Sequence, residues 1–285
     1  MPPKKGKGKS KYSRKQNTKS SEKKMEDVAL KVFNKNAEIK EAVVEFQNRR
    51  PPAAILTGDV LNAVIPDTRP NGSLSNYYQL LPGISQSVSG SAGRKYNTRI
   101  GNEIVLKSIH IQGILNYQLQ SSAGTLPQNH KIMVRFMVLS QKRAGNFTTA
   151  FTNISNRMLT NGTNADQNTG TFDGVALDSI RGINRDVFTV HYEKKFYLDA
   201  PVIQQGATDV DLSLVPSLIK FVDKKMYFGG KSGLKLSFAN ASATVPENFN
   251  PFICIGYSSV SKSNLAADDG LLNFAYNATA QYTDA

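Results

Sequence analysis

The basic side chains near the start of the chain carry the clearest chemistry in this sequence. Residues 1–24 contain ten lysines and arginines and one acid, Glu22, so they hold +9 of the net charge of +13. The other 261 residues contain 25 bases and 21 acids and are nearly balanced. Ammonium and guanidinium groups bind phosphate whatever the base sequence, and they release counterions as they do so. The candidate nucleic-acid-binding residues are Lys4, Lys5, Lys7, Lys9, Lys11, Arg14, Lys15 and Lys19.

The composition of this segment also predicts its conformation. Charges of one sign with almost no apolar residues cannot form a core, so we expect a disordered arm over residues 1–24 until a polyanion neutralises it. Tyr12 is its one aromatic residue, which disfavours readout of bases by stacking. Nuclear import receptors read the same kind of cluster. Its members here are Lys4, Lys5, Lys7, Lys9, Lys11, Arg14 and Lys15. A tail that only aids solubility would have a similar composition.

Bases outside the arm could extend a phosphate-binding surface. They are Arg49, Arg50, Arg94, Lys95 and Arg99, although scattered surface charge explains them equally well.

Motifs for nucleotide or calcium binding fail on spacing. The GGKSG stretch at 229–233 resembles the end of a phosphate-binding loop, but Lys225 stands where the first glycine belongs. A strand-like segment follows it, so we predict a turn. The stretch from Asp166 has its glycine, Gly170, one place too early for a calcium loop.

Residues for catalysis or metal binding are scattered. His110, His130 and His191 lack metal-ligand spacing, and the first and last are expected on polar strand faces. We interpret Asp209 and Asp211 as part of a charged loop or rim. Cys254 lies in an apolar run, which is typical of a buried thiol. We therefore predict no enzyme activity, no catalytic residue, no metal and no cofactor. One cysteine fits a reducing compartment.

Membrane association is not expected. Nowhere do about 18 consecutive apolar residues occur, as a spanning helix requires. The N-terminus also lacks the apolar region of a secretory signal.

One helix is predicted, over residues 26–48. Five apolar residues and Asn36 recur at intervals of three and four, which places them on one helical face. They are Ala29, Val32, Asn36, Ile39, Val43 and Phe46. Pro51 and Pro52 would end this helix. We expect it to pack on the body or on a neighbouring subunit.

From about residue 74 the apolar period is two, which predicts strands. Alternation is clear over 109–119, 187–198, 234–238 and 271–282, whereas 131–140 and 251–257 are apolar on both faces and read as central strands. Weaker candidates lie near 55–65, 74–81 and 212–222. Polar, glycine-rich loops separate them, so we predict an all-β fold, a single eight-stranded jelly roll of two antiparallel sheets. The expected organisation is a disordered basic arm (1–24), a short amphipathic helix (25–50) and a jelly-roll shell domain (51–285).

Several stretches together resemble a known family. They are TRIGNEIVLKSIHIQGILNY, HKIMVRFMVLSQKR, RDVFTVHYEKKFYLD, GKSGLKLSF and a final YTDA, behind a basic arm. Over about residues 70–285 the chain is similar to capsid proteins of circular, Rep-encoding single-stranded DNA viruses, the circovirus-like group. The resemblance implies an icosahedral virion of about sixty copies, arms directed onto the genome, and assembly in the host nucleus.

The expected function is therefore a self-assembling viral capsid protein that packages single-stranded DNA through its lysine-rich arm. Its expected partners are the genome, further copies of itself, nuclear import receptors and a host receptor of unknown identity. Two alternatives remain open: a jelly-roll coat protein of a small RNA virus, and a cellular nucleic-acid-binding β-sandwich protein.

Overall fold

The computed structural model describes residues 23–25, 28, 38–55, 72–86, 96–117, 131–142, 158–160, 171–199, 218–259 and 271–284. The chain divides into two compact units, residues 1–39 and 40–285. In the first unit, residues 23–25 and 28 are helical. None of the described helices is long and apolar enough to cross a membrane.

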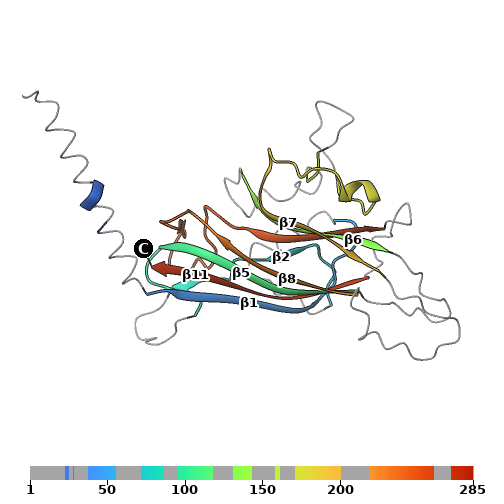
Figure 1. The fold of residues 1–285 in the computed structure, drawn as a ribbon. Helices are drawn as coiled ribbons and strands as arrows, with labels where there is room; N and C mark the ends of the chain where they lie inside the picture. Colours follow the sequence, from blue (N-terminus) through green and yellow to red (C-terminus); the bar gives the residue numbers. More distant parts are fainter. Residues whose placement is uncertain are drawn as a thin grey trace, which may run out of the picture. The chain divides into compact units, whose positions relative to one another are not determined.

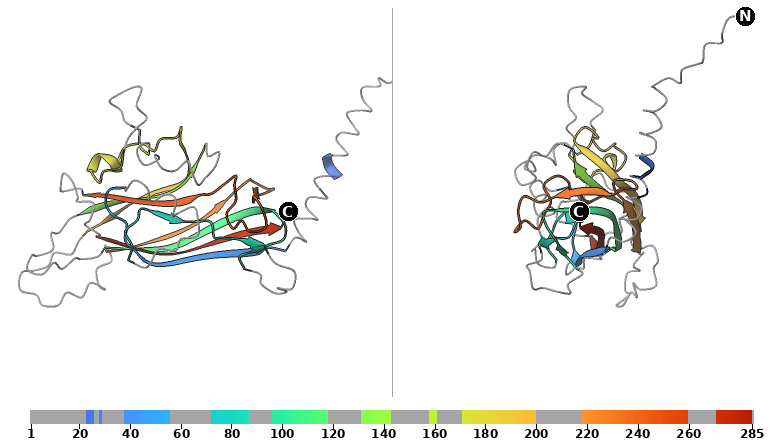
Figure 2. Two further views of the ribbon diagram at one scale, coloured as in Figure 1. Left: turned by 180° about the vertical axis from the view of Figure 1, so that it is seen from behind. Right: turned by 90° about the vertical axis from the view of Figure 1, so that its left-hand side faces the viewer.

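The second unit is built from two antiparallel sheets (Figures 1 and 2). Sheet 1 runs in the order β1 (Lys40–Arg49), β11 (Leu272–Asp284), β5 (Glu103–Tyr117) and β8 (Ile219–Tyr227), with β9 (Leu234–Ser237) also pairing with β5. Sheet 2 runs in the order β2 (Tyr77–Gln79), β10 (Phe252–Ser259), β6 (Ile132–Gln141) and β7 (Phe188–Leu198). Two short strands, β3 (Ser85–Gln86) and β4 (Thr98–Arg99), pair in parallel beside them. The all-β sandwich predicted from the sequence is confirmed.

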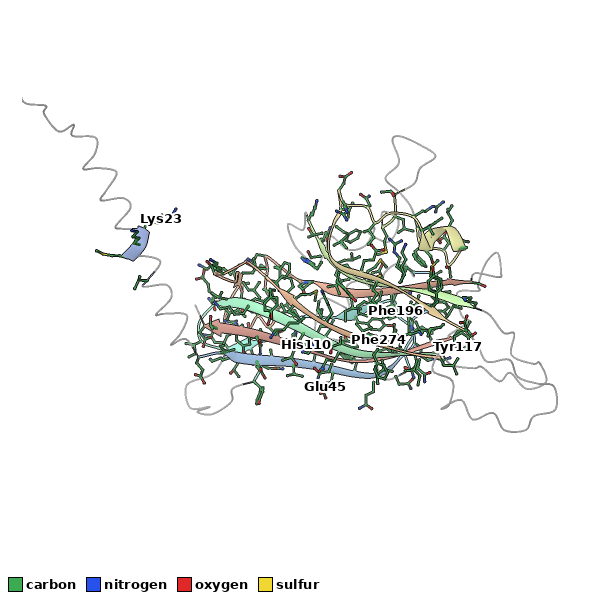
Figure 3. The ribbon with its side chains drawn as sticks, in the orientation of Figure 1. Lys23, Glu45, His110, Tyr117, Phe196 and Phe274 are labelled. Atoms are coloured by element: carbon green, nitrogen blue, oxygen red, sulfur yellow. The ribbon has the colours of Figure 1, made fainter. Side chains whose placement is uncertain are left out.

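The main core lies between the two sheets, as Figure 3 shows for Phe274 and Phe196. Strand β11 alternates from Leu272 to Tyr282, as predicted, and buries every second side chain of this stretch in the main core. These side chains are Leu272, Phe274, Tyr276, Ala278, Ala280 and Tyr282. Phe274 stacks on Tyr276 with ring centroids 4.8 Å apart and meets Phe136 of β6 edge-on at 5.8 Å. Rings of this size dominate the apolar area buried between the sheets.

A second core covers the far side of sheet 2. Strand β10 sends Ile253 and Ile255 into the main core and Phe252 and Cys254 into the second. Strand β6 divides in the same way, which confirms the prediction that both strands are covered on both faces. The 3₁₀ helix η3 (Ala176–Ser179) and its flanking loop lie on this side, at the top of Figure 1. Burial raises the pKa of the Cys254 thiol, so this cysteine is an inert packing residue.

The helix predicted over residues 26–48 is wrong for its second half. Residues 40–49 form strand β1, which pairs with β11 from Lys40 to Arg49. Ala42 is buried in the main core, and Val44 and Phe46 pack against it. The predicted helical face contained Val43 and Phe46, whereas a period of two joins Ala42, Val44 and Phe46. Backbone pairing with β11, together with the strand preference of β-branched residues, decides for the strand. Residues 29–37 lie outside the described part of the chain. The unit that contains the two sheets begins at residue 40, before the predicted domain boundary at 51.

The uniform alternation predicted for β7 is also wrong, because the strand carries a bulge. Tyr192 pairs with Val138, whereas Val190 pairs with Leu139, so His191 is the extra residue. As a result Phe188 and Val190 pack in the second core, while the strand beyond the bulge packs in the main core. A bulge of one residue exchanges the two faces of a strand.

The GGKSG stretch forms the predicted turn between β8 and β9. Gly229, Gly230 and Gly233 all have positive φ angles of 62° to 83°. A Cβ atom on Gly229 would lie 1.9 Å from the carbonyl oxygen of Gly233, so the chain needs glycine there.

Candidate functional site

The residues predicted to bind nucleic acid all lie outside the described part of the chain. They are Lys4, Lys5, Lys7, Lys9, Lys11, Arg14, Lys15 and Lys19, and the predicted import signal lies in the same N-terminal segment. Both assignments therefore stay predictions.

Two arginines proposed to extend the basic surface are structural. Arg99 is fully buried, and its Nη2 donates to the carbonyl oxygens of Asn240 and Ala243, each at 2.8 Å. Arg49 is buried with its guanidinium 4.2 Å from the ring centroid of Phe46. Buried arginines that bind the protein's own carbonyl groups or rings are not available to phosphate, so the prediction is wrong for these two.

The histidines that the structure describes do not form a catalytic or metal centre. His110 lies on the outer face of sheet 1, its Nε2 2.7 Å from Oδ1 of Asp223. His191 does not lie on a polar face, because the bulge places it between Phe228 and Phe249, at centroid distances of 5.4 and 5.6 Å. Desolvation by these neighbours lowers the pKa of His191. Among the described residues, no three His, Cys, Asp or Glu side chains are placed to hold a metal ion.

The outer face of sheet 1, which we call the open face, is a polar surface built by β1, β11, β5 and β8. Side chains from four strands form short cross-strand contacts on it. Asn277 Nδ2 donates to Glu45 Oε1 at 2.7 Å, and Lys225 Nζ donates to Gln281 Oε1 at 3.2 Å. Figure 3 shows Glu45 on this side of β1. Cross-strand pairs of this kind stabilise a solvated sheet face.

Three large apolar side chains interrupt the polar pattern of the open face. Phe221 is 69 % exposed, Tyr227 is 74 % exposed, and Ile114 is 42 % exposed. Exposed aromatic side chains that share a face with polar ones are typical of protein interfaces. The sequence signal was present in IKFVDKKMY, because Phe221 and Tyr227 alternate with the buried Val222 and Met226.

A shallow hollow of about 710 Å³ lies on the open face between β1 and β8. Its lining includes Glu45, Gln112, Phe221, Asp223 and Asn277. Two carboxylates repel phosphate, so this hollow does not suit a nucleic acid. Its mixture of aromatic, amide and acidic groups suits a protein surface with apolar and basic side chains.

The outer face of sheet 2 is closed by hydrogen bonds as well as by the second core. Arg135 donates from Nε to Glu193 Oε1 and from Nη1 to the carbonyl oxygen of Asp178, both at 2.8 Å. The Asp178 carboxylate is fully buried, and it accepts the backbone N–H groups of Asp173 and Val175 at 2.7 and 3.2 Å. Burial raises the pKa of Asp178, and these two hydrogen bonds oppose that shift. This network fixes the loop around η3.

No family model matches this chain, and no curated protein matches it.

Proposed function

We propose that this chain is a viral capsid subunit that assembles with copies of itself and packages single-stranded DNA by charge neutralisation. The observation that carries the proposal is the segregation of charge, +9 in residues 1–24 against +4 in the remaining 261. A nucleic-acid enzyme or sequence reader needs its charge on the folded surface that holds the bases. A packaging protein needs only a flexible cationic segment attached to a body that can tile.

The strand order of the body supports a jelly roll, the fold expected of such a subunit. β8 and β9 both pair with β5, so they count as one strand of an eight-stranded series. The first strand then pairs with the eighth (β1 and β11), the second with the seventh (β2 and β10), and the third with the sixth (β5 and β8). The fourth and fifth, β6 and β7, pair as well. Nested pairs of this kind arise when one long hairpin is wound into two sheets, as in a jelly roll.

The open face supports self-association. Phe221, Tyr227 and Ile114 expose apolar area on a rigid sheet, where a second copy would remove it from water. Glu45 and Asp223 beside them would select a partner surface with basic groups.

The proposal is tested with the full-length chain and a variant in which the eight predicted arm residues become Gln. We expect uniform spherical particles from both by electron microscopy, but nucleic acid only in the wild type. Retention of nucleic acid follows from absorbance at 260 and 280 nm, and digestion of the extracted material with DNase or RNase separates a DNA cargo from an RNA cargo. Nuclear accumulation of a fluorescent fusion should also be lost in the Gln variant.

Three outcomes would overturn parts of this proposal. Unchanged nucleic-acid content in the Gln variant would remove the arm from packaging. A monomer or small oligomer by light scattering would favour the cellular β-sandwich alternative. RNase-sensitive cargo would favour the coat protein of a small RNA virus.

A further inference from the structure

The edge strands β7 and β8 lie next to each other along one side of the sandwich (Figure 1). Lys224 Nζ of β8 lies 5.2 Å from the ring centroid of Tyr192 on β7. His191 of β7 meets Phe228, just beyond the end of β8, with ring centroids 5.4 Å apart. The two strands therefore run in opposite directions, so that residue numbers rise along β7 where they fall along β8. This fixes the order of the side chains along this side of the sandwich.

Three lysines occur on this side, and we call them the lysine edge: Lys194, Lys220 and Lys224. On β8, Lys220 and Lys224 share a strand face with the buried Val222 and Met226, because side chains alternate along a strand. On β7, Lys194 shares a face with Phe196, and its Nζ lies 4.8 Å from that ring centroid. The opposite directions of the two strands place Lys194 between Lys224 and Lys220 in order along the edge.

The lysine edge has no acidic counterpart in the described part of the chain. None of its three ammonium groups forms an ion pair with a described residue. The acids of the same strands point elsewhere, since Glu193 pairs with Arg135 and Asp223 pairs with His110. Lysine stems can pack against apolar groups and rings while the ammonium group stays in water. The ammonium groups are thus left to an external anion.

Phosphate suits this arrangement better than a base does. The ring of Phe196 is buried and Tyr192 is partly buried beneath Lys224, so neither presents a free stacking face. A row of cations without stacking rings contacts the backbone of a nucleic acid and not its sequence.

A structural role would also account for lysines at this position. Charged side chains that point inward from edge strands prevent pairing with further strands. That role predicts a change in self-association when the charges are removed, but no change in the salt dependence of nucleic-acid binding.

We propose that the lysine edge is a second phosphate-binding surface, on the body of the protein, which contacts the packaged strand in addition to the arm. This inference rests on the proposed function. Each phosphate neutralised on a single strand contributes about 0.7 to the slope of log K against log salt. Three contacts therefore contribute about 2.

The test compares the full-length wild type with the triple variant Lys194→Gln, Lys220→Gln and Lys224→Gln. Fluorescence anisotropy of a labelled poly-dT oligonucleotide gives the affinity at a series of NaCl concentrations. We expect the slope to become shallower by about 2 in the triple variant. The matched control changes Lys195, Lys225 and Lys231 to Gln, which removes the same charge from exposed positions off the lysine edge, and it should keep the wild-type slope.

The outcomes separate this inference from the function on which it rests. If the wild type binds the oligonucleotide and the triple variant has the same salt slope, only the proposal for the lysine edge is overturned. The same holds if the control variant changes the slope as much as the triple variant does. Absence of oligonucleotide binding by the wild type would overturn both. Retention on a heparin column gives a further readout. If the triple variant loses heparin retention but keeps the wild-type salt slope for the oligonucleotide, the lysine edge binds sulfated polysaccharide and the inference is overturned. If the triple variant aggregates, the three single Gln variants replace it, and each should change the slope by about 0.7.

Discussion

The two sheets of the sandwich share one core but differ in what covers their outer faces. Beyond sheet 2 lie the second core, the η3 loop and the buried pair of Arg135 and Glu193. The open face of sheet 1 carries amides, carboxylates and three exposed apolar side chains. The outer face of sheet 2 is therefore largely covered by the chain itself, whereas the open face is available to a partner.

This difference accounts for the composition of the strands. β6 and β10 are buried on both faces and are apolar nearly throughout. β11 and β8 are buried on one face and alternate. An apolar residue at an outward position thus means different things in the two sheets: Phe252 of sheet 2 belongs to a core, whereas Phe221 of sheet 1 is free to contact another molecule.

The largest effect should come from truncating a ring on the covered face. Phe252 is fully buried in the second core and meets Tyr77 and Phe188 edge-on. We expect Phe252→Ala to lower the free energy of unfolding by about 3–5 kcal/mol, because it leaves a cavity. On the open face, Phe221→Ala should change the free energy of unfolding by less than about 0.5 kcal/mol. Urea unfolding of dispersed subunits measures both, and equal losses would contradict the comparison.

A smaller loss of stability is expected where β10 contacts the loop around η3, which covers the outer face of sheet 2. A Cβ atom on Gly256 would lie 2.8 Å from Cε1 of Phe172, so Gly256→Ala must displace that ring. We expect a loss of about 1–3 kcal/mol from overpacking, together with faster hydrogen exchange in residues 171–184. The control is Ala275→Ser, on the open face, which should change neither quantity. Unaltered exchange in Gly256→Ala would mean that the loop is not held through Phe172.

The smallest of the three effects concerns pH and the bulge of β7. Burial lowers the pKa of His191, so the unfolded chain binds a proton more readily than the folded protein. The contribution of His191 to stability is therefore complete above pH 6.5 and is lost as the pH falls through its lowered folded pKa. The variant His191→Phe keeps a ring between Phe228 and Phe249. We expect its free energy of unfolding to depend less on pH between pH 7 and 5 than that of the wild type.

The result is a difference between two titrations, so any contribution shared by both proteins cancels. An identical pH dependence in wild type and His191→Phe would show that His191 is not the group responsible.

Much of the sandwich could be predicted from the sequence because alternation is a local property. The buried positions of β11 from Leu272 to Tyr282 follow from its period of two, and the double coverage of β6 and β10 follows from their mostly apolar sequences. Strand β1 could not be predicted in this way, since Ile39, Val43 and Phe46 fit one face of a helix, while Ala42, Val44 and Phe46 fit one face of a strand. The deciding partner, β11, lies more than 200 residues away, and Glu45 and Asn277, which contact each other, are 232 residues apart.

The candidate site was predictable only in part for the same reason. The basic arm is evident from charge alone, although its residues lie outside those the structure describes. His191 was assigned to the wrong face because the register shift between β6 and β7 has no local sequence signal. The lysine edge depends on two strands of different sheets lying next to each other, which no single segment encodes.

The pairing of β1 with β11 has a consequence for the synthesis of this protein. A ribosome that adds about 5–20 residues per second needs on the order of 10–50 seconds to reach β11 after β1 has emerged. During that interval β1 has no neighbour in its sheet, and one side of β5 is also unpaired, so both present open edges to other nascent chains. Folding of sheet 1 is therefore a late event, and a chain interrupted before β11 would be a target for chaperones or proteases.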